Sequence, residues 1–379
     1  MMNRIGILAL MSSLALGASS GFASDRKLMG KAIATGDLAD CALLSDGSVR
    51  CWGANVFGQL GNGTKTDSSM PVEVSGISKA VAVSTGGMHS CALLASGKVK
   101  CWGSNASEAL GGSSVASSSV PVAVSGVGKA IGLACGWNHT CVVLADGAVQ
   151  CWGSNNDGQL SKGTEEYNGV IVSVPGIANA VAVSTGKGSS CALLRGGEVW
   201  CWGRNNGAPP VKGMTSSAVP VPVSGISQAV EIAAGYSHTC ARLRAGLVRC
   251  WGSNDFGQLG NGTKTDSAVP VEVSGITDAV AIAGGAYHSC AVLKNGTIQC
   301  WGGNSGGELG NGTRTDSATP VRVTGIASAV RVDAGQFSTC ALLRGGQVQC
   351  WGANDNGQLG NGTSGPKSDS DVPITVKGF

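Results

Sequence analysis

The sequence predicts an all-β protein, a seven-bladed β-propeller built from four-stranded antiparallel blades. The first observation is a repeat, because the pattern Cys-x9-Cys-Trp-Gly occurs seven times with a period of 50 residues, once 49. Repeat periods of roughly 20–50 residues are typical of propellers and solenoids. The second observation is a series of short apolar or alternating runs without helical periodicity. The third is the presence of 61 glycines, which suit many tight turns.

The second repeat contains four predicted strands in order. A Val/Ala-rich run over 79–84 ends near Gly86 and predicts the first strand. His89–Leu94 and Val99–Gly103 predict the second and third strands, and a longer polar loop leads to the fourth, over 121–124. Turn signals at this spacing indicate an antiparallel meander, so one repeat makes one blade.

The hairpin between the second and third strands fixes which cysteines face each other. A three-residue hairpin loop favours glycine at its last position, and in the first repeat that loop is 45–47. Leu44 then faces Ser48, and counting back places Cys41 opposite Cys51 in a non-hydrogen-bonded pair. The Cα atoms of such a pair approach to about 4.5 Å, within the range of roughly 4.4–6.8 Å that a disulfide accepts.

The same count holds in every repeat and predicts seven disulfides. The predicted pairs are Cys41–Cys51, Cys91–Cys101, Cys141–Cys151, Cys191–Cys201, Cys240–Cys250, Cys290–Cys300 and Cys340–Cys350. The fifteenth cysteine, Cys135, remains unpaired. Equivalent positions in other repeats hold Thr, Ala or Gly, so we interpret Cys135 as a small buried apolar side chain, with a reactive thiol as the alternative.

The two ends of the chain match different parts of the repeat. Residues 32–36 match the first strand of the second repeat, whereas 372–379 match the segment 71–77. We therefore predict that 32–36 pairs with 373–377 and closes the ring. Closure by pairing of the N- and C-terminal strands leaves no unpaired strand edge.

The first 23 residues have the pattern of a secretory signal peptide. Arg4 precedes a short apolar run over 5–16, and small residues flank a cleavage site after Ala23. The apolar run is too short to span a bilayer; a buried N-terminal helix is the alternative. We predict a linker over 24–28, a propeller over 29–379, and a secreted or periplasmic protein without membrane insertion. The cysteine content suits the same oxidising compartments.

The repeat resembles a known family. Its motif, Gly-x-x-His-Ser/Thr-Cys-Ala followed by Cys-Trp-Gly-x-Asn-x-x-Gly-Gln-Leu-Gly-x-Gly, is clearest over Gly235–Gly262 and Gly335–Gly362. This pattern is similar to the repeat of the regulator of chromosome condensation family, and the cysteine pairs resemble its secreted bacterial branch. The resemblance covers about 29–379 and implies a seven-bladed propeller. We do not expect the guanine-nucleotide exchange activity known for this family, because a secreted chain does not meet a cytosolic GTPase.

Composition and motifs exclude several function classes. The net charge is +3, with 13% charged residues and no Lys/Arg run, so we do not expect nucleic-acid binding. Motifs of hydrolase elbows, zinc proteases and phosphate loops are missing, so we predict a non-enzyme without catalytic residues or cofactor. Four histidines share one repeat position, but separate blades hold them too far apart for one metal ion. We expect structural hydrogen bonds there and no metal site.

Two variable positions interrupt the regular repeat. The first slot is the pair after the glycine of each Gly-x-x-His turn, Gly87-Met88 in the second repeat; the second slot follows Trp-Gly-x-Asn, Val56-Phe57 in the first repeat. Alternating strand directions place both slots at one end of the ring. Aromatic residues gather there, and aromatics are enriched at binding hot spots. The predicted partner-binding residues are Phe57, Met88, Trp137, Tyr236, Phe256, Tyr287 and Phe337.

These observations predict a secreted monomer that binds a protein through this rim. The main alternative is an enzyme inhibitor, since a secreted β-lactamase inhibitor protein has a propeller of the same type. An exchange factor, a propeller enzyme and a purely structural surface protein are further alternatives. The bland interpretation of the rim is that its aromatics fill gaps between loops. The seven Cys-Trp-Gly tryptophans we assign to packing between blades.

Overall fold

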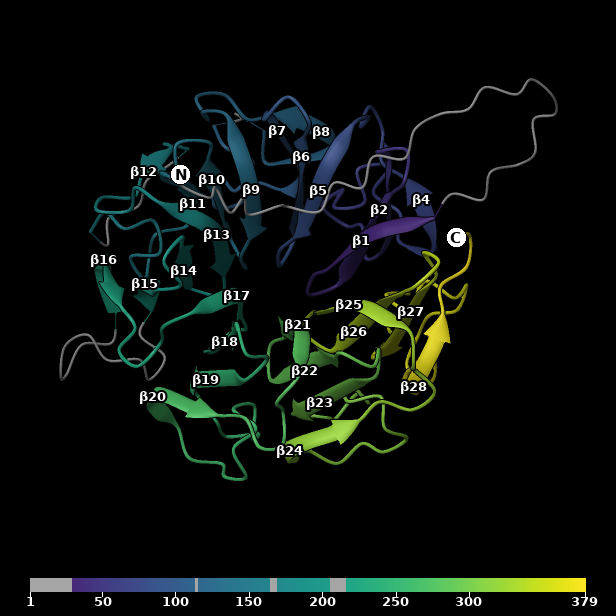
Figure 1. Cartoon of the computed structure of the whole chain (residues 1–379). Helices are drawn as coiled ribbons and strands as arrows, with labels where there is room; N and C mark the ends of the chain where they lie inside the picture. The colour runs from purple at the N-terminus through teal and green to yellow at the C-terminus, as the bar shows by residue number, and fades with distance from the viewer. Residues whose placement is uncertain (1–28, 113–114, 164–168, 205–215) are drawn as a thin grey trace, which may run out of the picture.

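Seven blades surround a central axis in the computed structural model (Figure 1). The structure describes residues 29–112, 115–163, 169–204 and 216–379. The predicted all-β, seven-bladed propeller is confirmed, and each blade is a four-stranded antiparallel sheet with its strands in chain order. The predicted signal peptide and linker, residues 1–28, lie outside the described residues. Among the described residues, no helix has the length and apolar character needed to cross a membrane.

Each strand occupies the same place in its blade as its equivalents in the other six. The innermost strands are β1 (Gly30–Thr35), β5 (Ala80–Thr85), β9 (Ala130–Cys135), β13 (Ala180–Thr185), β17 (Ala229–Ala234), β21 (Ala279–Gly284) and β25 (Ala329–Ala334). The second strands are β2 (Ala39–Leu44), β6 (His89–Leu94), β10 (His139–Leu144), β14 (Ser189–Leu194), β18 (His238–Leu243), β22 (His288–Leu293) and β26 (Ser338–Leu343). The third strands are β3 (Val49–Gly53), β7 (Val99–Ser104), β11 (Val149–Gly153), β15 (Val199–Arg204), β19 (Val248–Gly252), β23 (Ile298–Gly302) and β27 (Val348–Gly352). The outer strands are β4 (Ser68–Glu73), β8 (Ser117–Ala123), β12 (Val172–Ser173), β16 (Ser216–Pro222), β20 (Ser267–Glu272), β24 (Ser317–Arg322) and β28 (Ser370–Thr375).

The central hairpin of each blade has the predicted register. In blade one the Leu44 amide donates to the Ser48 carbonyl at 2.9 Å, and Cys41 lies opposite Cys51. All seven predicted cysteine pairs are disulfides, with Cα atoms 4.0 or 4.1 Å apart. This separation is slightly shorter than the value of about 4.5 Å typical of a non-hydrogen-bonded pair. Cys135 is a buried free cysteine at the end of β9.

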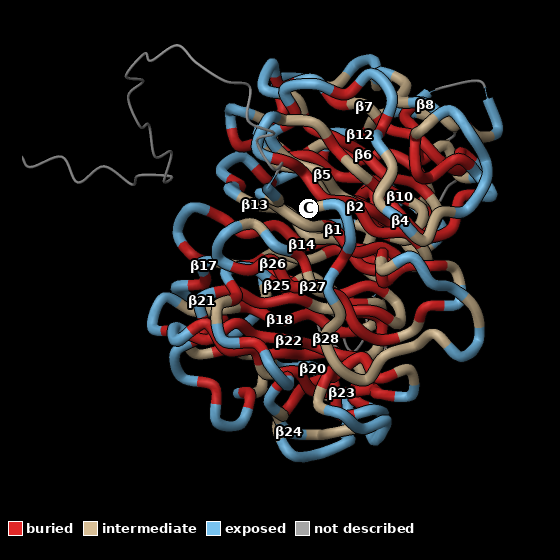
Figure 2. The backbone as a smooth tube through the Cα atoms, turned by 90° about the vertical axis from the view of Figure 1, so that its right-hand side faces the viewer, coloured by how far each residue is buried: buried red, intermediate tan, exposed pale blue. Residues whose placement is uncertain are grey.

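The hydrophobic core lies between blades rather than within them. Leu43 and Leu60 of blade one pack with Ala92 and Trp102 of blade two in one buried cluster. The Trp102 indole N–H also donates to the Gln59 carbonyl at 2.8 Å. Figure 2 shows the strands as mostly buried and the turns at the blade ends as exposed. The repeated tryptophans therefore join neighbouring blades, as the sequence predicts.

The predicted closure by pairing of the two terminal strands is wrong. β1 pairs with β2 and β28 pairs with β27, so each end stays within its own blade. The reason is that every repeat already contains all four strands of its blade, and both ends fall at a blade boundary. Blades seven and one are joined by packing: the Trp52 indole donates to the Gln358 carbonyl at 2.8 Å, and its ring contacts Phe379 at 5.8 Å.

Candidate functional site

The two ends of the ring carry different loops. The turns from first to second strand and the loops from third to fourth strand lie at one end, which we call the aromatic face. The hairpin turns between second and third strands and the connections between blades lie at the other end, the hairpin face. This assignment follows from the antiparallel order of each blade, and it places both variable slots on the aromatic face.

Five of the predicted binding residues form one aromatic cluster. The ring centroids of Trp137 and Tyr236 lie 6.4 Å apart, and those of Tyr236 and Tyr287 lie 6.0 Å apart. Tyr287 also contacts Phe256 at 5.0 Å and Phe337 at 6.4 Å. The cluster thus connects blades three, five, six and seven, and Phe256 joins the second slot to the first.

Phe57 and Met88, the other two predicted binding residues, take no part in these ring contacts. Phe57, in blade one, is 37% exposed, close to the 38% of Phe256. It makes no ring contact with the cluster in the part of the chain that the structure describes. Met88, in blade two, is partly buried. Ring contacts therefore join five of the seven predicted residues.

A ring of glycines fixes the base of the first-slot turns. A Cβ on Gly86 or Gly235 would collide with the carbonyl oxygen of the equivalent glycine in the next blade. Hydrogen bonds follow the same path, since the Asp37 amide donates to the Gly86 carbonyl and the Gln336 amide to the Gly36 carbonyl, both at 3.3 Å. The ring comprises Gly36, Gly86, Gly136, Gly186, Gly235, Gly285 and Gly335. Only glycine permits this approach, so the turns form a tight, continuous collar.

An acidic and a basic side chain lie beside the aromatic cluster. Asp37 of blade one lies beside Tyr236 and Trp137, and these side chains and the charge of Lys187 favour its ionised form. Burial outweighs these effects and raises the pKa of Asp37, while it also raises that of the Tyr236 hydroxyl. The Lys187 ammonium lies 4.1 Å from the centroid of the Trp137 ring and 5.5 Å from that of Tyr236. Because these residues come from blades one, three, four and five, their side chains meet across the mouth of the ring.

The sequence interpretation missed Asp37 and Lys187 because it selected aromatic side chains. The signal was present, since both residues directly follow a glycine of the collar, as Trp137 and Tyr236 do. Alignment of all seven first slots by this glycine would have shown an acid and a base in the same slot as the two aromatics.

A cavity of about 370 Å³ lies beneath this mouth and is lined by the innermost strands of all seven blades. Its walls are mainly small residues and backbone, with Glu231, Arg331 and Asp333 as charged members. One carboxylate oxygen of Asp333 accepts from the Thr35 amide at 2.6 Å. Burial raises the pKa of Asp333 to about 6. The buried Asp40 at the same seam also has a pKa well above its ordinary value, mainly through burial.

The four histidines bridge neighbouring blades. His89 Nε2 lies 2.9 Å from the Thr140 hydroxyl, and His238 Nε2 lies 2.7 Å from the Ser289 hydroxyl. His139 and His288 make equivalent contacts of 2.9 and 2.8 Å. Burial lowers the pKa of each histidine, to about 3 or about 4. The histidines are therefore neutral structural hydrogen-bonding groups.

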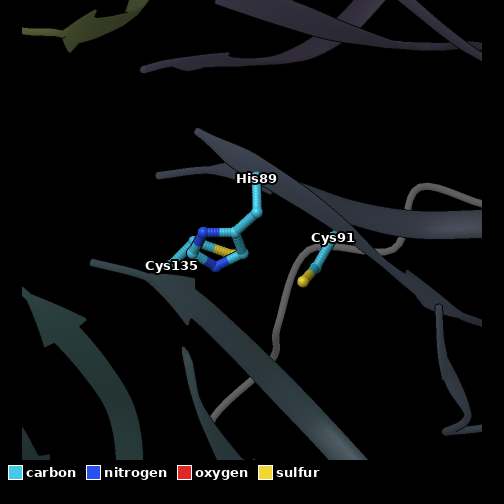
Figure 3. A group of neighbouring side chains, drawn as sticks. All are labelled: His89, Cys91 and Cys135. Atoms are coloured by element: carbon cyan, nitrogen blue, oxygen red, sulfur yellow. The ribbon is translucent and has the colours of Figure 1, made fainter. Parts of the chain in front are cut away.

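Figure 3 shows His89, Cys91 and Cys135 close together, an arrangement with metal-ligand residue types. The donor chemistry does not fit a metal, because Cys91 is bonded to Cys101 and offers no thiolate. Burial also raises the pKa of the Cys135 thiol to about 12, which keeps it protonated. A second such group, Asp40 with Cys340 and Cys350, contains a disulfide as well.

Comparison with family models and known proteins gives a consistent result. A model described as the RCC1-like domain matches residues 75–378. Two models of the regulator of chromosome condensation (RCC1) repeat match residues 46–93 and 31–59. No curated protein matches.

Three solved structures illustrate the similarity of fold. Human WBSCR16 is 24% identical with a TM-score of 0.76, covering 85% of this chain and 88% of its own. Yeast RCC1 (Prp20), in its complex with Kap60, is 22% identical with a TM-score of 0.76, covering 98% and 91%. The CRINKLY WD40 ectodomain of the Arabidopsis thaliana receptor kinase ACR4 is 22% identical with a TM-score of 0.53, covering 86% and 95%. At these identities the likeness establishes the fold alone.

Proposed function

Because this chain belongs to the family of the RCC1-like domain, we propose that it is a non-enzymatic module that binds a protein through its aromatic face. The observation that carries this proposal is the connected aromatic cluster on loops anchored by the glycine collar. Protein binding also occurs among structural neighbours, since yeast RCC1 (Prp20) has been crystallised with Kap60 bound. Here the site is assigned from the residues of this chain alone.

The aromatic face has the composition of a binding hot spot. Trp and Tyr supply large contact areas with few rotatable bonds, and they dominate the energy of many protein interfaces. The collar hydrogen bonds hold the turns before a partner arrives, so little conformational entropy is lost on binding. Asp37 and Lys187 add an acid and a base at the centre, which would orient a partner through polar contacts.

We place this activity outside the cytoplasm. The seven disulfides suggest an oxidising environment. Together with the N-terminal pattern of a secretory signal, they favour a secreted or periplasmic protein, and we propose that it acts as a monomer. The exchange activity of cytosolic relatives is not part of the proposal.

The test is capture of a partner from culture supernatant and cell-surface fractions. We expect the immobilised protein to retain a specific partner, and Trp137→Ala combined with Tyr287→Ala to weaken its binding by about thirtyfold or more. The matched control combines Asp46→Ala with Asp146→Ala, two exposed positions on the hairpin face. If the aromatic variant keeps the partner and the control variant loses it, the partner binds the hairpin face and the proposed assignment is wrong.

A further inference from the structure

The hairpin face carries a ring of exposed aliphatic side chains. In every blade, the ladder between first and second strands skips one residue near the start of the innermost strand, as where Ala80 pairs with Leu94 and Ala82 with Leu93. The skipped residue, Val81, leaves the ladder and is exposed. Its equivalents in blades three to seven are also exposed, and the six range from 36% to 55% exposed. The ring consists of Val81, Ile131, Val181, Val230, Val280 and Val330, with Lys31 at the equivalent position in blade one.

The ring lies in one plane at the level of the hairpin turns. The Ala80 amide donates to the Gly47 carbonyl of the preceding hairpin, and the Ala95 amide to the Lys79 carbonyl, both at 2.9 Å. The start of each innermost strand is thus bonded to the turns at this end. Equivalent residues in seven blades around one axis share a common height, so the six aliphatic side chains form a flat annulus.

Positive charge surrounds this annulus. Every blade contributes at least one exposed base from its hairpin, its inter-blade connection or the start of its innermost strand. The bases are Lys31, Lys79, Lys98, Lys129, Arg195, Arg244, Lys294, Arg331 and Arg344. None of these nine takes part in an ion pair among the residues that the structure describes. The exposed acids in the same segments are Asp46, Asp146, Glu198 and Asp278, so nine exposed bases there outnumber four exposed acids.

We propose that the hairpin face docks on the surface of an anionic lipid bilayer, with the aliphatic annulus at the acyl boundary and the bases at the headgroups. Apolar side chains bordered by Lys and Arg are the combination that peripheral membrane surfaces use. A bilayer is planar and requires no shape complementarity beyond a flat apolar ring. A nucleic acid or acidic polysaccharide would use the bases but gain nothing from the annulus. A protein partner is less favoured, because valine is under-represented at interface hot spots.

The test uses sedimentation of the full chain with vesicles of phosphatidylcholine, with and without one quarter phosphatidylglycerol. We expect binding only to the anionic vesicles, weakened by salt. Arg244→Glu with Lys294→Glu and Arg344→Glu should lower the partition constant at least about a hundredfold, since each base contributes about fivefold or more. Ile131→Ser with Val181→Ser and Val280→Ser should lower it about tenfold through lost apolar burial.

The matched control reverses the same number of charges on the aromatic face, at the exposed residues Lys65, Lys264 and Arg314. Binding within a factor of about three of the wild type is expected there, because those charges point away from the bilayer. Thermal unfolding of each variant establishes that it is folded. Failure of the wild type to bind anionic vesicles would overturn the proposal. So would a serine variant that binds as tightly as the wild type, because the face would then be a general polyanion site, and competition by DNA or heparin would identify it as such.

Discussion

The aromatic face and the hairpin face are made by the same seven repeats, yet they tolerate different kinds of variation. At the hairpin face, the glycines of the hairpin loops, such as Gly47, also touch the next blade, whereas those of the inter-blade connections, such as Gly76 and Gly225, have open space around them. At the aromatic face, the collar glycines touch the next blade, and the residues that directly follow them vary from Asp37 to Lys187 to Trp137. The comparison teaches that a rigid base allows chemical diversity immediately above it. The open inter-blade connections instead repeat nearly the same residues from blade to blade.

The largest expected difference between the two faces is the loss of folding stability at low pH. All four histidines begin second strands next to the aromatic face, and their pKa values of about 3 or about 4 lie below the ordinary value of 6.5. The unfolded chain therefore binds protons that the folded chain does not, and stability falls as the pH drops from about 6.5 to about 4. Each tenfold difference in proton affinity corresponds to about 1.4 kcal/mol, so one histidine contributes about 3 kcal/mol. Asp333, with its raised pKa of about 6, acts in the opposite direction and costs stability as the pH rises from about 4 to about 6.

Urea unfolding between pH 4 and pH 7 isolates the histidine contribution when the wild type is compared with a variant carrying serine at all four positions. Serine already occupies this position in blades four and seven, as Ser189 and Ser338. We expect the variant to lose most of the pH dependence and to keep the opposing slope of the buried acids. If the free energy of unfolding of the variant depends on pH as steeply as that of the wild type, the histidines do not cause the pH dependence.

The second difference concerns glycine. Gly235→Ala would bring a Cβ against the Gly285 carbonyl and the His238 ring, and we expect a loss of about 2–4 kcal/mol. Gly225→Ala, on the hairpin face, meets open space and only the strain of a positive φ of 81°, which costs about 1 kcal/mol. The free energy of unfolding in urea measures both. Equal losses of stability in the two variants would mean that the collar is packed no more tightly than the inter-blade connections.

The smallest effect tests the bridge across the mouth. Tyr236→Phe keeps the ring in the aromatic cluster but removes the hydroxyl that favours the ionised form of Asp37. We expect a loss of about 1 kcal/mol in urea unfolding at pH 7. Asp46→Asn on the exposed hairpin turn, where the carboxylate accepts from Ser48 at 2.9 Å, should leave stability nearly unchanged. If the two variants behave alike, the bridge contributes nothing beyond an ordinary surface contact.

Local rules predicted the parts of the fold that repeat. The glycine at the end of each hairpin loop determines the register, which in turn places Cys41 against Cys51 and predicts the disulfides. The predicted pairing of the two terminal strands was wrong. The composition of 32–36 and 373–377 fits strands that pair with each other equally well as strands that each belong to a complete blade. Only the count of strands per repeat, carried through to the last blade, distinguishes these cases.

The candidate site was predictable in part. Strand direction placed the aromatics of both slots at one end, and five of them meet there. Their contacts with Asp37 and Lys187 depend on which blades face each other across the mouth, and spacing along the chain carries no such information. Similarly, Val81 is a residue type common in innermost strands. Its exposure results from a β-bulge, and the residues at this position do not indicate one.

The noncovalent seam between blades seven and one has a mechanical consequence. Both ends of the described chain lie at this seam, so tension applied to them acts on the contact between Trp52 and Phe379 before it reaches any other blade. The ring would open there and then extend one blade at a time. Each disulfide prevents the residues between its cysteines from extending, and the two cysteines are 10 residues apart in a repeat of 50. Unfolding of one blade therefore lengthens the chain by about 140 Å rather than about 170 Å. Reduction would lengthen every step of extension without changing the number of steps.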